Sequence, residues 1–267
     1  MIKDHIVLTD FEKEFIYAIK EKNVFPVFQP IVDSSGRLKG YEILSRWRRM
    51  GKTITPGEFL IHIHCDYVWL KLTESMLHEA IAKINTSYGE IYFSVNIPAC
   101  LTGTDELFSI IINATKALMN PQWRERLVLE INEAVDIRIN CKTMVSIEKL
   151  KHQGINVFLD DCFSQSSVTF PVRATHFGGY KLDITIVNDF KDDPYAEALI
   201  KSLVYYCQLT KSCCIAEGVD SYEKFNLLKS LGVDYFQGYL FSPPVSFNNL
   251  KSNNLTDLKK SFFNVSN

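Results

Sequence analysis

The sequence lacks a surplus of charge of either sign. Its 267 residues include 29 Lys and Arg against 31 Asp and Glu, so the formal net charge is −2. Proteins that bind nucleic acid polymers neutralise phosphates with basic side chains and usually carry a basic surplus. The near balance therefore speaks against a nucleic acid polymer as the partner of this chain.

Long apolar runs are also absent. A helix that spans a membrane needs roughly 20 apolar residues, whereas runs such as residues 155–159 are far shorter. The first five residues contain no apolar core of the kind found in secretory signals. We therefore expect a cytoplasmic protein with no membrane span.

Several reactive motifs are missing as well. The seven cysteines are odd in number, and their only close pair is the adjacent Cys213 and Cys214, which excludes a disulfide framework and a zinc-ligand spacing. We expect free thiols in a reducing compartment. The sequence contains neither a Gly-x-Ser-x-Gly nucleophile motif nor a glycine-rich phosphate loop.

What the chain does contain is a regular alternation of strand and helix patterns. Eight runs rich in β-branched or aromatic residues predict strands, at residues 25–33, 40–47, 91–97, 127–132, 156–161, 180–185, 214–218 and 235–241. The clearest helix pattern between them has Asp193 as N-cap and Pro194 at its first position. It places an apolar stripe on one face, formed by Leu199, Ile200, Leu203, Val204 and Cys207.

This alternation predicts an α/β fold with a mostly parallel sheet covered by helices. The connection at residues 33–37 is too short for a parallel crossover, so the first two strands should form an antiparallel hairpin. We therefore predict a TIM-like (β/α)8 barrel with one antiparallel strand, for which the chain length suffices. Residues 1–24 are expected to form a lead-in helix, residues 25–250 the barrel domain, and residues 251–267 a polar tail.

Acidic residues gather at the ends of the predicted strands. They are Glu42, Glu130, Asp160, Asp161, Asp183 and Glu217. In such a barrel the strand ends meet at one face, where sites are built. With only Lys181 and Arg46 nearby, repulsion would push several carboxylates toward protonation, and divalent cations would relieve it.

The composition of this set indicates the kind of cation. Carboxylates joined by the Asn96 amide suit hard ions such as Mg²⁺, Mn²⁺ or Ca²⁺. More than four acidic ligands leave room for two ions, with Asp160 and Asp161 able to serve both. Two such ions can act together on a phosphodiester, so the pattern favours phosphate ester hydrolysis.

The motifs at these positions occur in a particular order. Phe28-Gln29-Pro30-Ile31 comes first, and Glu42-Ile43-Leu44 and Arg46-Trp47 follow. The later motifs are Pro56-Gly57-Glu58-Phe59-Leu60, Ser94-Val95-Asn96, Glu130-x-x-Glu133, Asp160-Asp161, Lys181-Leu182-Asp183, Ala216-Glu217-Gly218-Val219 and Phe236-Gln237-Gly238-Tyr239. Over residues 20–250 this order resembles the EAL domain of bacterial cyclic di-GMP phosphodiesterases.

The resemblance implies roles for individual residues. Glu42, Asn96, Glu130 and Asp160 match the first metal shell, and Asp160, Asp161 and Glu217 match the groups at a second metal and its bridging water. The catalytic positions are matched by Lys181, Glu217, Asp161 and Gln237, with Lys181 holding or deprotonating the attacking water. Contacts to the dinucleotide are matched by Gln29, Leu44, Arg46 and Asp183, and Glu133 matches a glutamate that anchors a regulatory loop.

The implied reaction cleaves cyclic di-GMP to linear pGpG and so lowers this second messenger in bacterial signalling. Mg²⁺ or Mn²⁺ would support it, and Ca²⁺ would inhibit it. Family members commonly pair, so a homodimer is expected. No sensory partner domain is evident, which suggests a stand-alone EAL protein.

One segment departs from the family. After the paired aspartates the family usually reads Asp-Asp-Phe-Gly-Thr-Gly-Tyr-Ser-Ser, whereas this chain reads Asp160-Asp161-Cys162-Phe163-Ser164-Gln165-Ser166-Ser167. It is one residue shorter and lacks both glycines, so this loop should take another path. Two alternatives stay open: a receptor or interaction module that has lost turnover and regulates a protein partner, and a different metal-dependent barrel enzyme.

Overall fold

The computed structural model describes residues 6–132, 141–164 and 175–252. The elements in chain order are α1 (Asp10–Lys20), β1 (Val24–Asp33), β2 (Leu38–Arg49), β3 (Lys52–Ile54), α2 (Pro56–Phe59), η1 (Leu60–His62), α3 (Asp66–Thr86), β4 (Tyr92–Ile97), α4 (Asp105–Thr115), η2 (Pro121–Arg126), β5 (Leu127–Asn132), α5 (Cys141–His152), β6 (Asn156–Cys162), β7 (Gly179–Leu182), α6 (Ile184–Asp189), α7 (Pro194–Thr210), β8 (Cys213–Ala216), α8 (Tyr222–Ser230), β9 (Tyr235–Gln237) and α9 (Phe247–Ser252).

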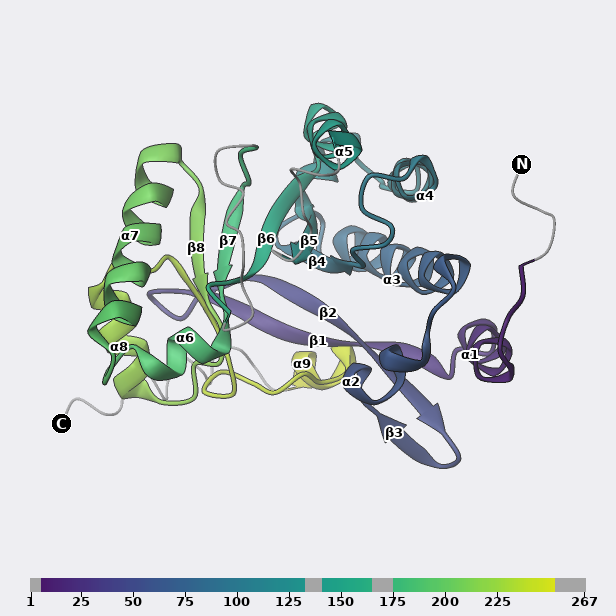
Figure 1. The fold of residues 1–267 in the computed structure, drawn as a ribbon, viewed down its shortest axis with the longest axis horizontal. Coiled ribbons are helices and arrows are strands. Elements are labelled where there is room, and N and C mark those ends of the chain that lie inside the picture. The colour runs from purple at the N-terminus through teal and green to yellow at the C-terminus, as the bar shows by residue number, and fades with distance from the viewer. Residues whose placement is uncertain (1–5, 133–140, 165–174, 253–267) are drawn as a thin grey trace.

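Eight strands of the described residues close into a barrel, and β3 lies outside it (Figure 1). Around the barrel the order is β1, β9, β8, β7, β6, β5, β4 and β2, and β2 pairs again with β1. Strands β2 and β4 to β9 run parallel to one another, while β1 is antiparallel to both of its neighbours. The predicted barrel with one reversed strand is confirmed.

The turn between β1 and β2 explains the reversal. The carboxylate of Asp33 accepts hydrogen bonds from the backbone N–H groups of Ser35, at 2.9 Å, and Arg37, at 3.0 Å. Gly36 takes φ 73°, which glycine adopts without strain. A second hairpin joins β2 to β3 and extends away from the barrel (Figure 1). The sequence did not predict β3, because its three residues are largely exposed and show no strand alternation.

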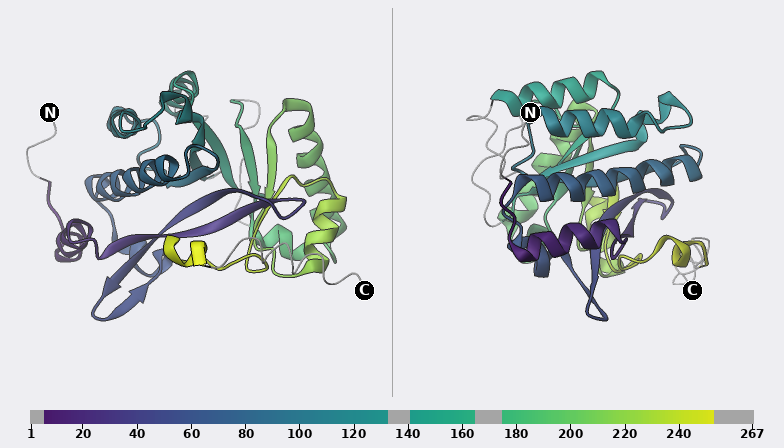
Figure 2. Two further views of the ribbon diagram at one scale, coloured as in Figure 1. Left: turned by 180° about the vertical axis from the view of Figure 1, so that it is seen from behind. Right: turned by 90° about the vertical axis from the view of Figure 1, so that its right-hand side faces the viewer.

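Helices cover the outside of the barrel in two groups. Figure 2 shows α1, α3, α4 and α5 stacked along one side, and Figure 1 shows α6, α7 and α8 on the other. Phe15 of α1 is fully buried and packs edge-on against Trp47, with ring centroids 5.0 Å apart. Within the described residues, every helix is too short or too polar to span a bilayer.

Helix α7 begins as predicted, since the Asp193 side chain accepts a hydrogen bond from the Tyr195 N–H at 2.8 Å. Its buried face differs from the predicted stripe in one position. Leu199 is 43% exposed, and Ala196 is buried instead. The periodic pattern counts apolar residues, but it does not show that a small alanine fits the closer contact with the barrel.

Three predicted strands end earlier in the structure. They stop at Leu182, Ala216 and Gln237 rather than at residues 185, 218 and 241. In the first case Asp183 caps α6, which begins at once. Most of the predicted tail, residues 253–267, lies outside the described residues.

The barrel interior is layered. Side chains alternate along each strand, so every second residue faces inward. Near one end the interior is filled by an apolar cluster of Ile31, Val128, Phe158 and Ile215. Two residues further along β5 and β6, and directly after β8, the inward positions belong to Glu130, Asp160 and Glu217. The barrel interior is therefore apolar at one end, and at the other end, where the parallel strands finish, it is lined by ionisable side chains.

Candidate functional site

The ionisable end of the barrel opens into a cavity of about 540 Å³. Eight of the residues singled out in the sequence line it, namely Gln29, Glu42, Leu44, Asn96, Asp160, Asp161, Glu217 and Gln237. They come from β1, β2, β4, β6 and β9 and from the residue that follows β8. Residues up to 208 positions apart in the chain are therefore in contact here.

Lys181 lies beneath this cavity and is fully buried. Its Nζ is 2.6 Å from Glu217 Oε1 and 3.1 Å from both Glu130 Oε2 and Asp160 Oδ1. Glu42 Oε2 is slightly farther away, at 3.4 Å. One ammonium group thus serves four carboxylates.

Burial opposes a charge on Lys181, but the surrounding carboxylates, with Asp160 first, hold its pKa well above the usual value. Burial also raises the pKa of the carboxylates that share it. The pKa of Glu217 rises to about 8, and those of Asp160 and Glu130 rise as well, because Lys181 offsets only part of the cost. Among the described residues, four carboxylates share the ammonium group of Lys181, and the pKa of three of them lies above its usual value.

Glu42 is the exception among these carboxylates. Burial favours its neutral form, yet Lys181, Gln237 and Asn96 together lower its pKa. Asn96 Nδ2 donates to Glu42 Oε1 at 2.7 Å, and Gln237 Nε2 donates to Glu42 Oε2 at 2.6 Å. Gln237 also donates to Gln29 Oε1 at 3.0 Å. These amides fix the carboxylate of Glu42 in one orientation.

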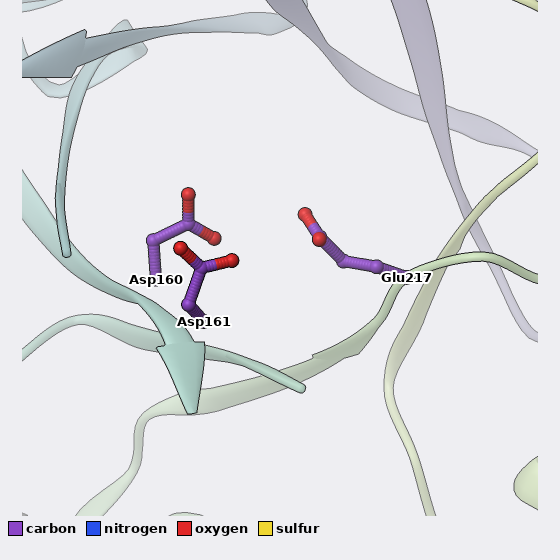
Figure 3. A group of neighbouring side chains, drawn as sticks. All are labelled: Asp160, Asp161 and Glu217. Carbon is purple, nitrogen blue, oxygen red and sulfur yellow. The ribbon is translucent and has the colours of Figure 1, made fainter. Parts of the chain in front are cut away.

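A cation fits between Asp160, Asp161 and Glu217. One carboxylate oxygen from each lies within 4.8 Å of the others. Figure 3 shows Asp160 and Asp161 at the end of β6 and Glu217 facing them from the loop after β8. Asp161 adopts φ 56°, a left-handed conformation that aspartate tolerates better than most residues, and Asn132 donates a hydrogen bond to it. The raised pKa values of Asp160 and Glu217 indicate that added positive charge would stabilise this group.

Arg46 and Asp183, two of the predicted contacts to the dinucleotide, are not among the residues that line the cavity. Arg46 donates to the Ser45 carbonyl at 2.8 Å, and burial lowers the pKa of its guanidinium. Asp183 accepts a hydrogen bond from the Thr185 N–H at 2.8 Å and so begins α6. Glu133, the expected loop anchor, lies outside the described residues.

The altered loop after the paired aspartates is described only through Ser164. Phe163 stands fourth in this run, where the family pattern has its first glycine, and it adopts φ 64°. This left-handed conformation costs a residue with a side chain roughly 1–2 kcal/mol. The segment next to the candidate cation ligands is therefore strained.

The sequence did not reveal that Asn188 and Asp220 also line the cavity. Asn188 lies in α6, where its polar character is typical of a solvent-facing position. Asp220 follows Glu217 by three residues on the same loop, which was the one signal available in the sequence.

Comparison with known proteins identifies relatives of this chain. A family model described as the EAL domain matches residues 12–244. A protein of Escherichia coli (strain K12) named probable cyclic di-GMP phosphodiesterase PdeG is 24% identical over 240 residues, which are 86% of this chain and 46% of PdeG. The chain spans less than half the length of the first curated relatives that it matches, with 46%, 36% and 34% covered.

Solved structures share the fold. The PaMucR phosphodiesterase in its c-di-GMP complex is similar with a TM-score of 0.82 and 22% identity, over 91% of this chain and 100% of that one. Klebsiella pneumoniae BlrP1, solved as a manganese/cy-diGMP complex at pH 9.0, is similar with a TM-score of 0.71 and 21% identity, over 84% of this chain and 56% of that one.

Proposed function

The chain belongs to the EAL domain family, and we propose that it hydrolyses cyclic di-GMP to linear pGpG with the help of two divalent cations. The observation that carries the proposal is the group of Asp160, Asp161 and Glu217, whose oxygens lie within 4.8 Å of one another beside the buried Lys181. It is supported by the names of the relatives, since PdeG is called a probable cyclic di-GMP phosphodiesterase and the BlrP1 complex contains manganese.

The proposed ligands form two sets. Glu42, Asn96, Glu130 and Asp160 would hold one cation, and Asp160, Asp161 and Glu217 would hold the other. Such cations, when bound, offset the charge of phosphate oxygens and make a water molecule more acidic. We propose Mg²⁺ or Mn²⁺ for this role. Ca²⁺ would inhibit, because it accepts looser geometry and more ligands.

The chain's own groups would orient the attacking water. Lys181, whose Nζ lies 2.6 Å from Glu217 Oε1, would hold the attacking water or help to deprotonate it. Asp161 and Glu217 face the same space (Figure 3) and offer carboxylate oxygens for that proton. Gln237 would keep Glu42 in place through its 2.6 Å hydrogen bond.

The dinucleotide would lie over this mouth. Gln29 and Leu44 line the cavity there, and we propose that Arg46 and Asp183 complete the contacts to the substrate. Arg46 is suited to a phosphate because its guanidinium offers several donors in one plane. The proposal includes a cytoplasmic location, where this messenger is made and consumed. It also includes pairing of two copies near the altered loop, which Glu133 would anchor.

A turnover assay tests the proposal directly. Purified chain is incubated with cyclic di-GMP in Mg²⁺, Mn²⁺ or Ca²⁺, and pGpG is measured by chromatography. We expect product with Mg²⁺ or Mn²⁺ and little with Ca²⁺. Glu42→Ala should lower the rate at least about 10³-fold, while its circular dichroism spectrum stays unchanged. Binding of cyclic di-GMP without pGpG in any of the three metals would contradict hydrolysis.

That contrary result would support the second candidate, a cyclic di-GMP receptor that regulates a protein partner. The strained Phe163, with φ 64°, favours it, because a loop under strain next to the ligands can misplace them. If the chain neither bound nor cleaved cyclic di-GMP, a different metal-dependent barrel enzyme would be the remaining candidate.

A further inference from the structure

Lys224 lies behind the wall of the cavity, in the first turn of α8. Its side chain is only 10% exposed. The ammonium group donates to Asn188 Oδ1 at 2.7 Å and to the Gly218 carbonyl at 3.4 Å, and it lies 3.0 Å from Asp220 Oδ1. All three partners line the cavity, whereas Lys224 does not.

This is an unfavourable place for a lysine on general grounds. A cation near a helix N-terminus is opposed by the helix dipole, and a buried ammonium loses its hydration. An ammonium group has three donors, and here each of them has an acceptor within 3.4 Å. The stability of α8 alone does not explain a lysine at position 224. Its hydrogen bonds to Asn188 and Gly218 and its ion pair with Asp220 do.

The segment that Lys224 holds is the loop carrying Glu217. On its other side this loop is fixed by Val219, whose N–H donates to the Gln237 carbonyl and whose carbonyl accepts from Leu240, both at 3.0 Å. Gly218 takes φ 64°, and a Cβ there would lie 2.2 Å from Ile184. Val219 thus bonds the loop to the segment that begins with Gln237, and Lys224 bonds the same loop, at Gly218 and Asp220, to Asn188 of α6.

We infer that Lys224 is a positioning residue for the cation site: by holding the Gly218 carbonyl, Asp220 and Asn188, it sets the place of Glu217 opposite Asp160 and Asp161. The inference rests on the proposed function, since it concerns the same cation ligands. Groups that hold metal ligands in place, without binding the metal, typically change metal affinity or activity 10- to 100-fold when they are removed.

The test measures Mn²⁺ affinity of the whole chain without substrate, by electron paramagnetic resonance of free Mn²⁺, alongside hydrolysis of cyclic di-GMP. Lys224→Met removes the ammonium and keeps the length of the side chain. The matched control is Lys191→Met. Lys191 is more exposed than Lys224, and its Nζ lies 2.5 Å from Oε1 of Glu223, the residue before Lys224. A double variant, Asp220→Asn with Lys224→Met, removes the paired charges together.

We expect Lys224→Met to weaken Mn²⁺ binding about 10-fold and Lys191→Met to leave it unchanged. The double variant should bind Mn²⁺ as weakly as Lys224→Met does, because the Gly218 carbonyl and Asn188 still lack the donor that Lys224 supplies. Wild-type affinity in Lys224→Met, recovery in the double variant, or absence of Mn²⁺ binding in the wild type would each overturn the inference. If Lys224→Met fails to fold, Lys224→Leu, which likewise has no donor, is read by the same criteria.

Activity and affinity separate the two proposals. A wild-type chain that binds Mn²⁺ but produces no pGpG contradicts the proposed hydrolysis, while the Mn²⁺ affinities of the variants still decide the role of Lys224.

Discussion

Glu12 and Glu130 each expose only 1% of their surface, but Glu12 lies close beneath the surface and Glu130 deep inside the barrel, and their carboxyl pKa values shift in opposite directions. Burial raises the pKa of both. Hydrogen bonds from Thr9, His64 and Cys65 overcome this effect for Glu12 and lower its pKa to about 2. Glu130 shares Lys181 with Glu42, Asp160 and Glu217, and its pKa stays well above the usual value.

Two differences set the contrast: the deeper burial of Glu130, and the number of donors that each carboxylate has to itself. Glu12 accepts from the backbone N–H groups of Thr9, His64 and Cys65 at 2.8 to 2.9 Å, and so it ties α1 to the segment before α3. The carboxylates at the barrel mouth compete for one ammonium. A buried acid with its own donors serves the fold, whereas a group of acids short of positive charge is typical of a site that receives a cation.

Removing the shared ammonium gives the largest expected effect. Lys181→Met should lower cyclic di-GMP hydrolysis about 10³-fold, or about 4 kcal/mol of activation free energy, because the water loses its donor. The rate is measured by pGpG formation in Mn²⁺. Lys229→Met, which removes an exposed lysine bonded to the Ser34 carbonyl at 2.9 Å, is the control and should keep the wild-type rate. More than a tenth of the wild-type rate in Lys181→Met would show that Lys181 is not part of the reaction.

The opposite change tests the structural carboxylate. Glu12→Gln should lower the free energy of unfolding by about 2–3 kcal/mol, since buried N–H groups lose a charged acceptor, and it should leave hydrolysis within about twofold. Urea denaturation followed by circular dichroism measures the loss. Glu14→Gln on the same helix removes only a partly exposed pair with Arg49 at 2.7 Å and should cost under about 1 kcal/mol. Equal losses of unfolding free energy in the two variants would show that the buried Glu12 stabilises the fold no more than the partly exposed Glu14.

Acid should erase that stability difference. The folded pKa of Glu12 is about 2, below the ordinary value of 4.5, so its contribution is present above pH 4.5 and is lost as the pH falls toward 2. The gap between wild type and Glu12→Gln should therefore close between pH 5 and 2, as followed by denaturation at each pH. A constant gap would mean that the carboxylate charge contributes nothing.

The pH dependence of stability that Glu217 contributes should have the opposite sign to that of Glu12, and it should be smaller. Its folded pKa of about 8 lies above the ordinary 4.5, so without divalent cations the folded chain binds the extra proton and loses stability as the pH rises from 5 to 8. We expect the melting temperature to fall by roughly 5 °C more in wild type than in Glu217→Gln. Added Mn²⁺ should remove the difference, because it supplies the missing charge. A difference that Mn²⁺ leaves unchanged would contradict a cation at this place.

The sequence predicted those features that depend on short segments. The brief connection at residues 33–37 dictates the antiparallel hairpin, and the strand ends place Glu42, Asp160 and Glu217 at one mouth. It did not predict that one lysine serves four carboxylates, because these contacts join residues up to 139 positions apart and depend on side-chain distances. Glu12 was missed for a related reason. On a helix an acid normally faces water, and nothing local shows that the N–H groups of His64 and Cys65 meet it.

The two amide contacts of Gln237 link the site to the order in which the chain folds. Gln237 bonds to Gln29 and Glu42 across 208 and 195 residues of chain, and β9 closes the barrel against β1. We expect contacts of such separation to form after the local β1–β2 hairpin, because closing a longer loop costs more chain entropy. Glu42 would then gain its hydrogen bond from Gln237 only when the barrel closes, and an incompletely folded chain would bind cations poorly although its ligand residues are all present.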